Sequence, residues 1–312
     1  MIPVYQPSIT SLEKQYVNDC LDSSWISSKG KYVNLFEKSF AEKTGVDYAT
    51  TVCNGTVALH LALLALGIGP GDEVIVPTFT YIASVNAIVY CGATPIFVDC
   101  LEDTWQVDPE DVAKKITSKT KAIMIVHLYG QSCDMDSICK IVKENDIFLV
   151  EDCAEGFGTR YKGRHVGSFG DISTYSFFGN KTITAGEGGM VVTNNETLYR
   201  RAVHLKGQGL AEHRQYWHDV VGYNYRMTNI EAGFLYDQLN DLNHILSLKE
   251  KIFKNYDILL KKHITNGEII KIINEENTVS ATWMYCINIP NLNFKSIENF
   301  MNDKMIQIRP LF

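Results

Sequence analysis

The sequence lacks the features that would place it in a membrane, outside the cell or on a nucleic acid. Its longest apolar stretch covers residues 57–66, is interrupted by His60 and is too short to span a bilayer. The first residues contain neither the basic segment nor the apolar segment of a signal peptide. No long block of lysine and arginine occurs and the net charge is −7, so nucleic acids and anionic membranes are poor candidates for partners.

Paired cysteines, repeats and low-complexity tracts are missing as well. The eight cysteines are scattered, with neither a C-x-x-C pair nor a grouping with histidine that would indicate a metal site. We therefore expect no bound metal, reduced thiols and a cytoplasmic protein. Cys153 is the only cysteine expected close to the chemistry described below, and packing is its favoured role. What remains is a globular chain of 312 residues, enough for one large domain and a smaller one.

Short apolar runs alternate with helical patterns between about residues 45 and 200. The runs lack polar alternation, which is typical of parallel strands that are covered on both faces. Helices between them have readable ends, since Asp108 can cap a helix that begins at Pro109. We expect an α/β fold with a mostly parallel, doubly wound sheet, in which ligands bind beyond the carboxyl ends of the strands. The apolar runs are residues 74–76, 96–98, 122–126 and 147–150.

The pattern changes in the last third of the chain. Residues 228–231 form a capping box, and a long helical stretch follows to about Lys262. The remainder looks like a small α/β unit that stops abruptly after an apolar segment. We therefore predict a large domain of residues 1–240, which includes the N-terminal segment, and a small, incomplete C-terminal domain of residues 241–312.

The segment around Lys181 carries the strongest chemical signal. Lys181 lies among small and aromatic residues in the segment 176–189, shortly after a strand-like run and before a cluster of glycines. Asp152 follows the apolar run 147–150, and Ser176 precedes the lysine. A pyridoxal 5'-phosphate enzyme needs a lysine that forms a Schiff base, a carboxylate that pairs with the pyridine nitrogen and a hydroxyl that helps to hold the phosphate. The alternatives are an exposed loop lysine and an aspartate that caps or forms a salt bridge at a strand end.

A second signal lies where Asn54, Gly55 and Thr56 lead directly into an apolar helix. Glycine lets an anion approach the backbone, and the first amides of a helix are unpaired donors at the positive end of its dipole. Thr56 adds a hydroxyl. The plain alternative is a helix N-cap with a turn glycine, and the phosphate role gains weight only from Ser176 and Lys181.

Four further residues are weaker candidates. Tyr81 could stack on the cofactor ring, although a lone aromatic residue is more often part of the core. Glu155 could lie near the ring hydroxyl of the cofactor or at the surface. Asn224 and Arg226, among aromatic residues before a helix, could bind an anion or only tie the loop down. Spacing alone does not choose among these roles.

Together these motifs resemble the DegT/DnrJ/EryC1/StrS family of sugar-nucleotide aminotransferases, which have the aspartate aminotransferase (fold type I) architecture. The resemblance covers nearly the whole chain. The segment 213–219 is most similar to the branch that aminates GDP-4-keto-6-deoxy-mannose to GDP-perosamine for O-antigen and lipopolysaccharide biosynthesis. A related dehydratase branch has histidine at the lysine position, so Lys181 favours transamination. The resemblance also rests on the segments 24–30, 54–61, 176–189 and 207–210.

The resemblance implies a role for each candidate residue. Lys181 would be the lysine that binds pyridoxal 5'-phosphate, and Asp152 the partner of its pyridine nitrogen. Tyr81 matches the ring-stacking position. Asn224 matches a residue that reaches the phosphate in the neighbouring subunit, which implies a homodimer with shared active sites, and glutamate would be the amino donor. The phosphate cradle would consist of Gly55, Thr56 and Ser176.

One departure limits the resemblance. Members of the family continue beyond the segment that corresponds to residues 309–312, through a further strand and helix with a histidine near the active site. We therefore expect a truncated C-terminus, and whether it leaves the enzyme active is open. Two alternatives also stay open at this point. One is the same chemistry on a UDP- or dTDP-linked keto sugar, and the other is a truncated, non-catalytic remnant that only binds the cofactor or dimerises.

Overall fold

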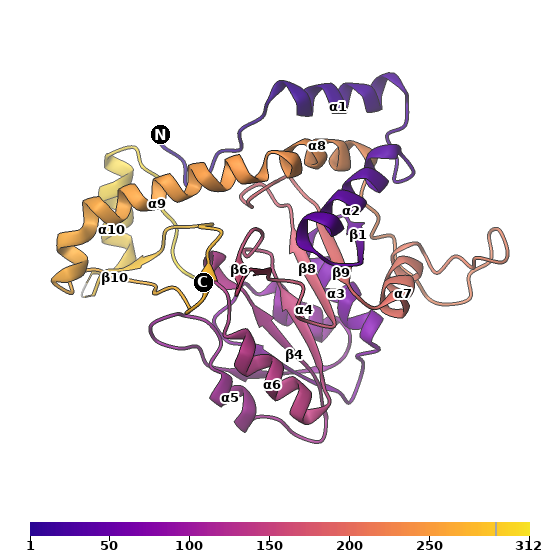
Figure 1. Ribbon diagram of the computed structural model, residues 1–312, viewed down its shortest axis with the longest axis horizontal. Coiled ribbons are helices and arrows are strands. Elements are labelled where there is room, and N and C mark those ends of the chain that lie inside the picture. Colours follow the sequence, from indigo (N-terminus) through magenta and orange to yellow (C-terminus); the bar gives the residue numbers. More distant parts are fainter. Residues whose placement is uncertain (291) are drawn as a thin grey trace.

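The computed structural model describes residues 1–290 and 292–312, and a seven-stranded sheet forms its centre (Figure 1). The strands are β1 (Tyr48–Val52), β2 (Glu73–Pro77), β3 (Thr94–Val98), β4 (Thr120–Val126), β5 (Phe148–Asp152), β8 (Ile172–Ser176) and β9 (Gly189–Thr193). Their order across the sheet is β1-β9-β8-β5-β4-β2-β3. Neighbours from β8 to β3 are parallel, whereas β9 runs antiparallel to β8 and β1. The predicted α/β fold with a mostly parallel sheet is confirmed.

Helices cover both faces of this sheet. They are α2 (Lys31–Thr44), α3 (Gly55–Leu66), α4 (Ala83–Tyr90), α5 (Pro109–Lys114), α6 (Met135–Asn145) and α7 (Glu196–Lys206). Successive strand residues point to opposite faces, so Val74 and Val76 lie in the buried cluster of α3, α4 and α7. Ile75 lies in the cluster of α5 and α6 on the other face. The strands β2, β4 and β5 are thus buried on both sides, which explains why their sequences lack polar alternation.

Polar caps begin the helices that the sequence predicts. Asp108 accepts a hydrogen bond from the backbone N–H of Glu110 and caps α5. Thr228 and Glu231 form the predicted capping box, which begins α8 (Asn229–Asn240). Both helix starts are therefore confirmed.

The predicted helical stretch to Lys262 is wrong in one respect, because it consists of two helices. The helix α8 ends at Asn240, and α9 (Leu242–Thr265) begins after Asp241. Asp241 has φ −90° and ψ 6°, which takes the backbone out of the α-helical conformation at this residue. The break lets α9 leave the large sheet and run toward α10 (Figure 1).

The part of the chain after α9 adds a strand to a small sheet and also forms hydrogen bonds with loops of the large sheet region, among them the one from the Ala281 N–H to the Gly130 oxygen. Here β10 (Ile270–Lys271) pairs with β12 (Ile287–Asn288). In contrast, β11 (Thr278–Val279) pairs with β6 (Arg160–Tyr161), which also pairs with β7 (Arg164–His165). The division into residues 1–240 and 241–312 stays a prediction. The other elements are α1 (Ser11–Asp22), which lies along α8, the 3₁₀ helix η1 (Leu128–Gly130) and α10 (Phe294–Asp303).

Within the described part of the chain, no helix combines the length and the apolar character that a membrane span requires.

Candidate active site

A cleft of about 1710 Å³ lies at the carboxyl ends of β5 and β8. Segments far apart in the sequence form its walls, among them the start of α3, the helix α9 and residues 306–312. The position agrees with the expectation that a ligand binds at this edge of a parallel sheet. The predicted site residues that line the cleft are Gly55, Thr56, Tyr81, Asp152, Glu155, Ser176 and Lys181.

Lys181 belongs to the wall of this cleft, and its side chain is only 14% exposed. Its Nζ lies 3.6 Å from Oε1 of Glu155 and 4.3 Å from the centroid of the Trp283 ring. Phe177 and Ile183 are fully buried on either side and anchor the segment in the core. The alternative of an exposed loop lysine is therefore wrong. The sequence gives no sign of the contact with Trp283, which belongs to no motif and comes from the C-terminal part of the chain.

Asp152 ends β5, and its side chain is buried beside the cleft. Its Oδ1 accepts a hydrogen bond from the backbone N–H of Ala154 (3.0 Å), and its Oδ2 accepts one from the Ser84 hydroxyl (2.8 Å). The Ser84 hydroxyl lies 3.1 Å from that of Thr80. Burial raises the pKa of Asp152, whereas its two hydrogen bonds and the charge of Lys181 oppose that rise. Asp152 thus caps a local turn with one oxygen, and its role toward the cofactor stays a prediction.

Glu155 lies inside the protein and is 4% exposed, so the surface role that the sequence leaves open is wrong. Its Oε2 accepts a hydrogen bond from the backbone N–H of Tyr129 (2.9 Å), while its Oε1 faces Lys181. Burial raises the pKa of Glu155 to about 7, although the charge of Lys181 and the Tyr129 hydrogen bond act in the opposite direction. A carboxyl group with this pKa beside a lysine can take up or release a proton near neutral pH.

Replacing Glu155 with glutamine should change how the stability of the cofactor-free protein depends on pH. The folded-state pKa lies above the ordinary value of 4.5, so proton binding stabilises the folded protein fully below that value. This contribution is lost as the pH rises through about 7. Glutamine does not titrate and so lacks this contribution at every pH. When the pH is raised from about 5 to about 8, the parent chain should therefore lose about 1–3 kcal/mol of unfolding free energy that the variant does not lose. Urea unfolding at both pH values measures the difference, and identical pH dependence in both proteins would contradict it.

The start of α3 forms a cradle beside Ser176. Asn54 accepts a hydrogen bond from the backbone N–H of Val57 (3.0 Å) and caps the helix. The N–H groups of Gly55 and Thr56 occupy the first turn, where no intrahelical acceptor exists. A Cβ on Gly55 would come within 2.7 Å of the Cβ of Ser176, so glycine keeps this space open. The N-cap role therefore belongs to Asn54, and the adjoining donors fit an anion such as a phosphate.

Tyr81 and Asn224 lie in different surroundings. Tyr81 is 59% exposed and lines the cleft, with its ring 5.7 Å from that of Phe312, so the core role is wrong for it. Asn224 is exposed and, within the described residues, does not line the cleft of its own chain. Its Oδ1 accepts a hydrogen bond from Nε of Arg226 (3.1 Å). The segment before it, residues 208–222, extends away from the rest of the chain (Figure 1), and a role for Asn224 in a neighbouring subunit stays a prediction.

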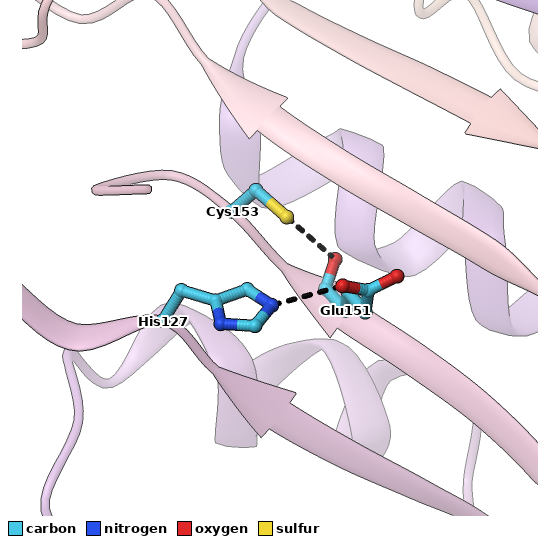
Figure 2. Close-up of side chains that lie close together, drawn as sticks. All are labelled: His127, Glu151 and Cys153. Carbon is cyan, nitrogen blue, oxygen red and sulfur yellow. Dashed lines mark hydrogen bonds and ion pairs between the residues drawn. The ribbon is translucent and has the colours of Figure 1, made fainter. Parts of the chain in front are cut away.

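On the face of β5 opposite to Asp152, three buried polar side chains gather, namely His127, Glu151 and Cys153 (Figure 2). Their donor atoms lie within 4.8 Å of one another, close enough to hold a metal ion. However, Oε2 of Glu151 is 2.9 Å from Nε2 of His127, and the carboxylate also accepts hydrogen bonds from the N–H groups of residues 167, 169 and 170. Burial raises the pKa of the Cys153 thiol well above its usual value, so the thiol stays protonated. These contacts indicate that Glu151 stabilises the fold by joining β5 to His127 and to the loop of residues 167–170.

Cys153 has the packing role that the sequence favours, since it is fully buried in the core cluster. The expectation that it alone lies near the chemistry is wrong. Alternate strand residues face opposite sides of the sheet, so Cys153 points away from the cleft, whereas Cys286 lines it.

Replacing Glu151 with glutamine should destabilise the protein strongly. The amide has one acceptor oxygen, so its NH2 group would face donors that now bind the carboxylate, and buried unmatched donors are unfavourable. We expect the unfolding free energy to fall by about 2–4 kcal/mol. Urea unfolding measures the loss, with Glu144→Gln as the matched control because that carboxylate is 61% exposed on α6. Equal stability of the two variants would show that Glu151 does not stabilise the fold in this way.

Comparisons with known proteins identify the family. Residues 7–312 match the DegT/DnrJ/EryC1/StrS aminotransferase family. The chain belongs to this family. It is 60% identical to GDP-perosamine synthase from Escherichia coli O157:H7, and the aligned region covers 100% of this chain and 84% of that protein.

Solved structures agree with this membership in the DegT/DnrJ/EryC1/StrS family. A mutant GDP-4-keto-6-deoxymannose-3-dehydratase with bound GDP-perosamine is 26% identical with a TM-score of 0.92, covering 100% of this chain and 86% of that one. The E. coli GDP-4-keto-6-deoxy-D-mannose-3-dehydratase with bound hydrated PLP is also 26% identical with a TM-score of 0.92, covering 100% and 85%. The predictions of fold type, aminotransferase family and pyridoxal 5'-phosphate as cofactor are confirmed. Dehydratases share the fold, so the predicted choice of transamination rests on the aminotransferase family match and the identity to GDP-perosamine synthase, together with Lys181.

Proposed function

We propose that this chain is a pyridoxal 5'-phosphate-dependent 4-aminotransferase that converts GDP-4-keto-6-deoxy-mannose to GDP-perosamine. The observation that carries the proposal is the convergence of Lys181, Asp152 and the start of α3 on one cleft. The substrate follows from the 60% identity to a GDP-perosamine synthase over the whole of this chain. The product would serve O-antigen and lipopolysaccharide biosynthesis.

The residues of the cleft fit this cofactor. When bound, the cofactor supplies an electron sink that stabilises negative charge on the substrate carbon. Lys181 would hold it covalently through Nζ, and the buried carboxylate of Asp152 would pair with its pyridine nitrogen. The Ser176 hydroxyl, the Thr56 hydroxyl and the first N–H groups of α3 would hold its phosphate. Tyr81 would lie against the ring from the exposed side of the cleft.

The same side chains can move protons. Once released from the cofactor, the amine of Lys181 would transfer a proton between the substrate carbon and the cofactor carbon. Glu155 lies 3.6 Å from that amine and its pKa is about 7, so the two groups can exchange a proton near neutral pH. Glu155 would also lie beside the ring hydroxyl. The Trp283 ring lies against Lys181 and would keep water from that side of the amine.

Glutamate would be the amino donor in a ping-pong cycle that releases 2-oxoglutarate. The enzyme would work in the cytoplasm as a homodimer in which Asn224 reaches the phosphate in the neighbouring site. Two observations support a site shared between subunits: Asn224 is exposed, and among the residues that the structure describes it lies outside the cleft of its own chain.

The nucleotide is tested by offering 4-keto-6-deoxy sugars linked to GDP, UDP or dTDP to the glutamate-treated enzyme. Mass spectrometry then measures the rate at which each amino sugar forms. The GDP-linked sugar should react with a kcat/KM at least about tenfold higher than the others. A faster reaction of the UDP- or dTDP-linked sugar would show that the assigned substrate is wrong, while the aminotransferase reaction would still stand. The comparisons favour neither that alternative nor a non-catalytic remnant.

A further inference from the structure

A second lysine, Lys249, lines the cleft from α9. Its Nζ donates a hydrogen bond to the backbone oxygen of Trp283 (3.3 Å) and lies 5.0 Å from the centroid of the Tyr5 ring. The indole ring of the same tryptophan lies 4.3 Å from Nζ of Lys181. Trp283 therefore contacts both ammonium groups, one through its backbone oxygen and the other through its ring.

Lys249 has no anionic partner among the described residues, since no carboxylate there lies within 4.0 Å of its Nζ. Its side chain is half-buried, and burial lowers its pKa to about 8. Lys206 offers a contrast, because this lysine, whose side chain is 12% exposed, pairs with Glu37 at 3.3 Å. A cation that is partly withdrawn from water without a carboxylate beside it is unfavourable. The position of Lys249 therefore indicates a negatively charged partner that the chain itself does not supply.

The reactants of the proposed function contain such a partner, and the inference rests on that function. A GDP-linked sugar carries a diphosphate, and glutamate carries carboxylates. We propose that Lys249 binds an anionic oxygen of a reactant in the cleft, either a phosphate of the nucleotide sugar or a carboxylate of the amino donor. An ammonium group has three donors and Trp283 accepts from one, so two are left for the ligand. The contact of both lysines with Trp283 would place this anion close to the reacting end of the cleft.

Two substitutions at this position and one control test the proposal. Lys249→Met removes the charge and keeps most of the length of the side chain, whereas Lys249→Arg keeps the charge. Lys251→Met is the matched control, because Lys251 is exposed on the same helix. Isothermal titration calorimetry measures the affinity of each cofactor-loaded protein for GDP and for 2-oxoglutarate.

For one of the two probes, we expect Lys249→Met to bind about 10- to 100-fold more weakly, the range typical of a hydrogen bond to a charged group. Lys249→Arg should bind more tightly than Lys249→Met, and the control should match the parent chain. A loss confined to GDP assigns Lys249 to the phosphates, and a loss confined to 2-oxoglutarate assigns it to the donor carboxylate. Unchanged affinity for both probes would overturn the proposal.

The absorption band of the bound cofactor and the melting temperature of each variant distinguish a role of Lys249 in ligand binding from a role in folding. A Lys249→Met protein that loses the band, melts earlier and binds neither probe would mean that the lysine supports the fold, which overturns the proposal. If only the role of Lys249 is wrong, the band and its response to glutamate remain as in the parent chain. If the proposed function is wrong, that response is already missing in the parent chain.

Discussion

Replacing Lys181 with alanine should abolish the visible absorption band of the bound cofactor and lower kcat by more than about 10³-fold, because one side chain supplies both the covalent attachment and the proton transfer. Its Nζ faces the cleft beside Glu155 and the ring of Trp283. Lys249 contacts only the backbone oxygen of Trp283, so it is not placed to replace Lys181. The remaining contacts of Lys181 are few, so the variant should still fold. Absorption spectra with added cofactor and steady-state kinetics measure both effects.

Lys140→Ala is the matched control for this substitution, since Lys140 is 73% exposed on α6. The loss of the Lys181 charge should also raise the pKa of Glu155 further, because that charge now opposes the effect of burial. A Lys181→Ala enzyme that turns over at the parent rate would rule out the proposed role of the lysine.

Replacing Asp152 with asparagine should lower kcat by about 10²- to 10³-fold, because the amide removes the negative charge that would face the pyridine nitrogen. The amide oxygen can still accept the hydrogen bond that Oδ1 now accepts from Ala154, so the local turn should persist. The effect on kcat therefore reports on charge rather than on folding. Steady-state kinetics and a cofactor titration of the variant measure it.

Asp136→Asn is the control for Asp152→Asn, since the Asp136 side chain is 61% exposed. Normal kcat in Asp152→Asn, together with normal cofactor affinity, would mean that this carboxylate only caps its turn.

The central strands of the sheet are predictable from the sequence, but its antiparallel edge is not. Strands β2, β4 and β5 are buried on both faces and therefore read as apolar runs, whereas the edge strand β3 is only partly buried. In contrast, β1 contains Thr50 and Thr51 and has no apolar run, and the run 190–192 in β9 is not recognised as a strand because it follows the glycine cluster that ends at Gly189. Their pairing with each other and with β8 is a long-range effect that no local pattern encodes. The break at Asp241 is also missed, although Asn240, Asp241 and Asn243 are weak helix formers, because the helical pattern continues on both sides of them.

The site shows the same division between local and long-range information. Gly55, Asp152 and Lys181 stand in short motifs at the ends of strands and helices, and the cleft brings these motifs together. Ser84 and Trp283 have no motif of their own, and they reach the site only because α4 and the C-terminal part of the chain pack beside it. The burial of Glu155 likewise depends on the packing around Tyr129, so its exposure could not be decided from the sequence.

The most direct test of the proposed function is the visible absorption spectrum of the purified protein with pyridoxal 5'-phosphate, recorded before and after the addition of glutamate. We expect a band from the cofactor joined to Lys181, and we expect glutamate to bleach it as the amino group passes to the cofactor. A band that glutamate leaves unchanged would contradict the aminotransferase function, and the absence of any band would contradict the cofactor site itself.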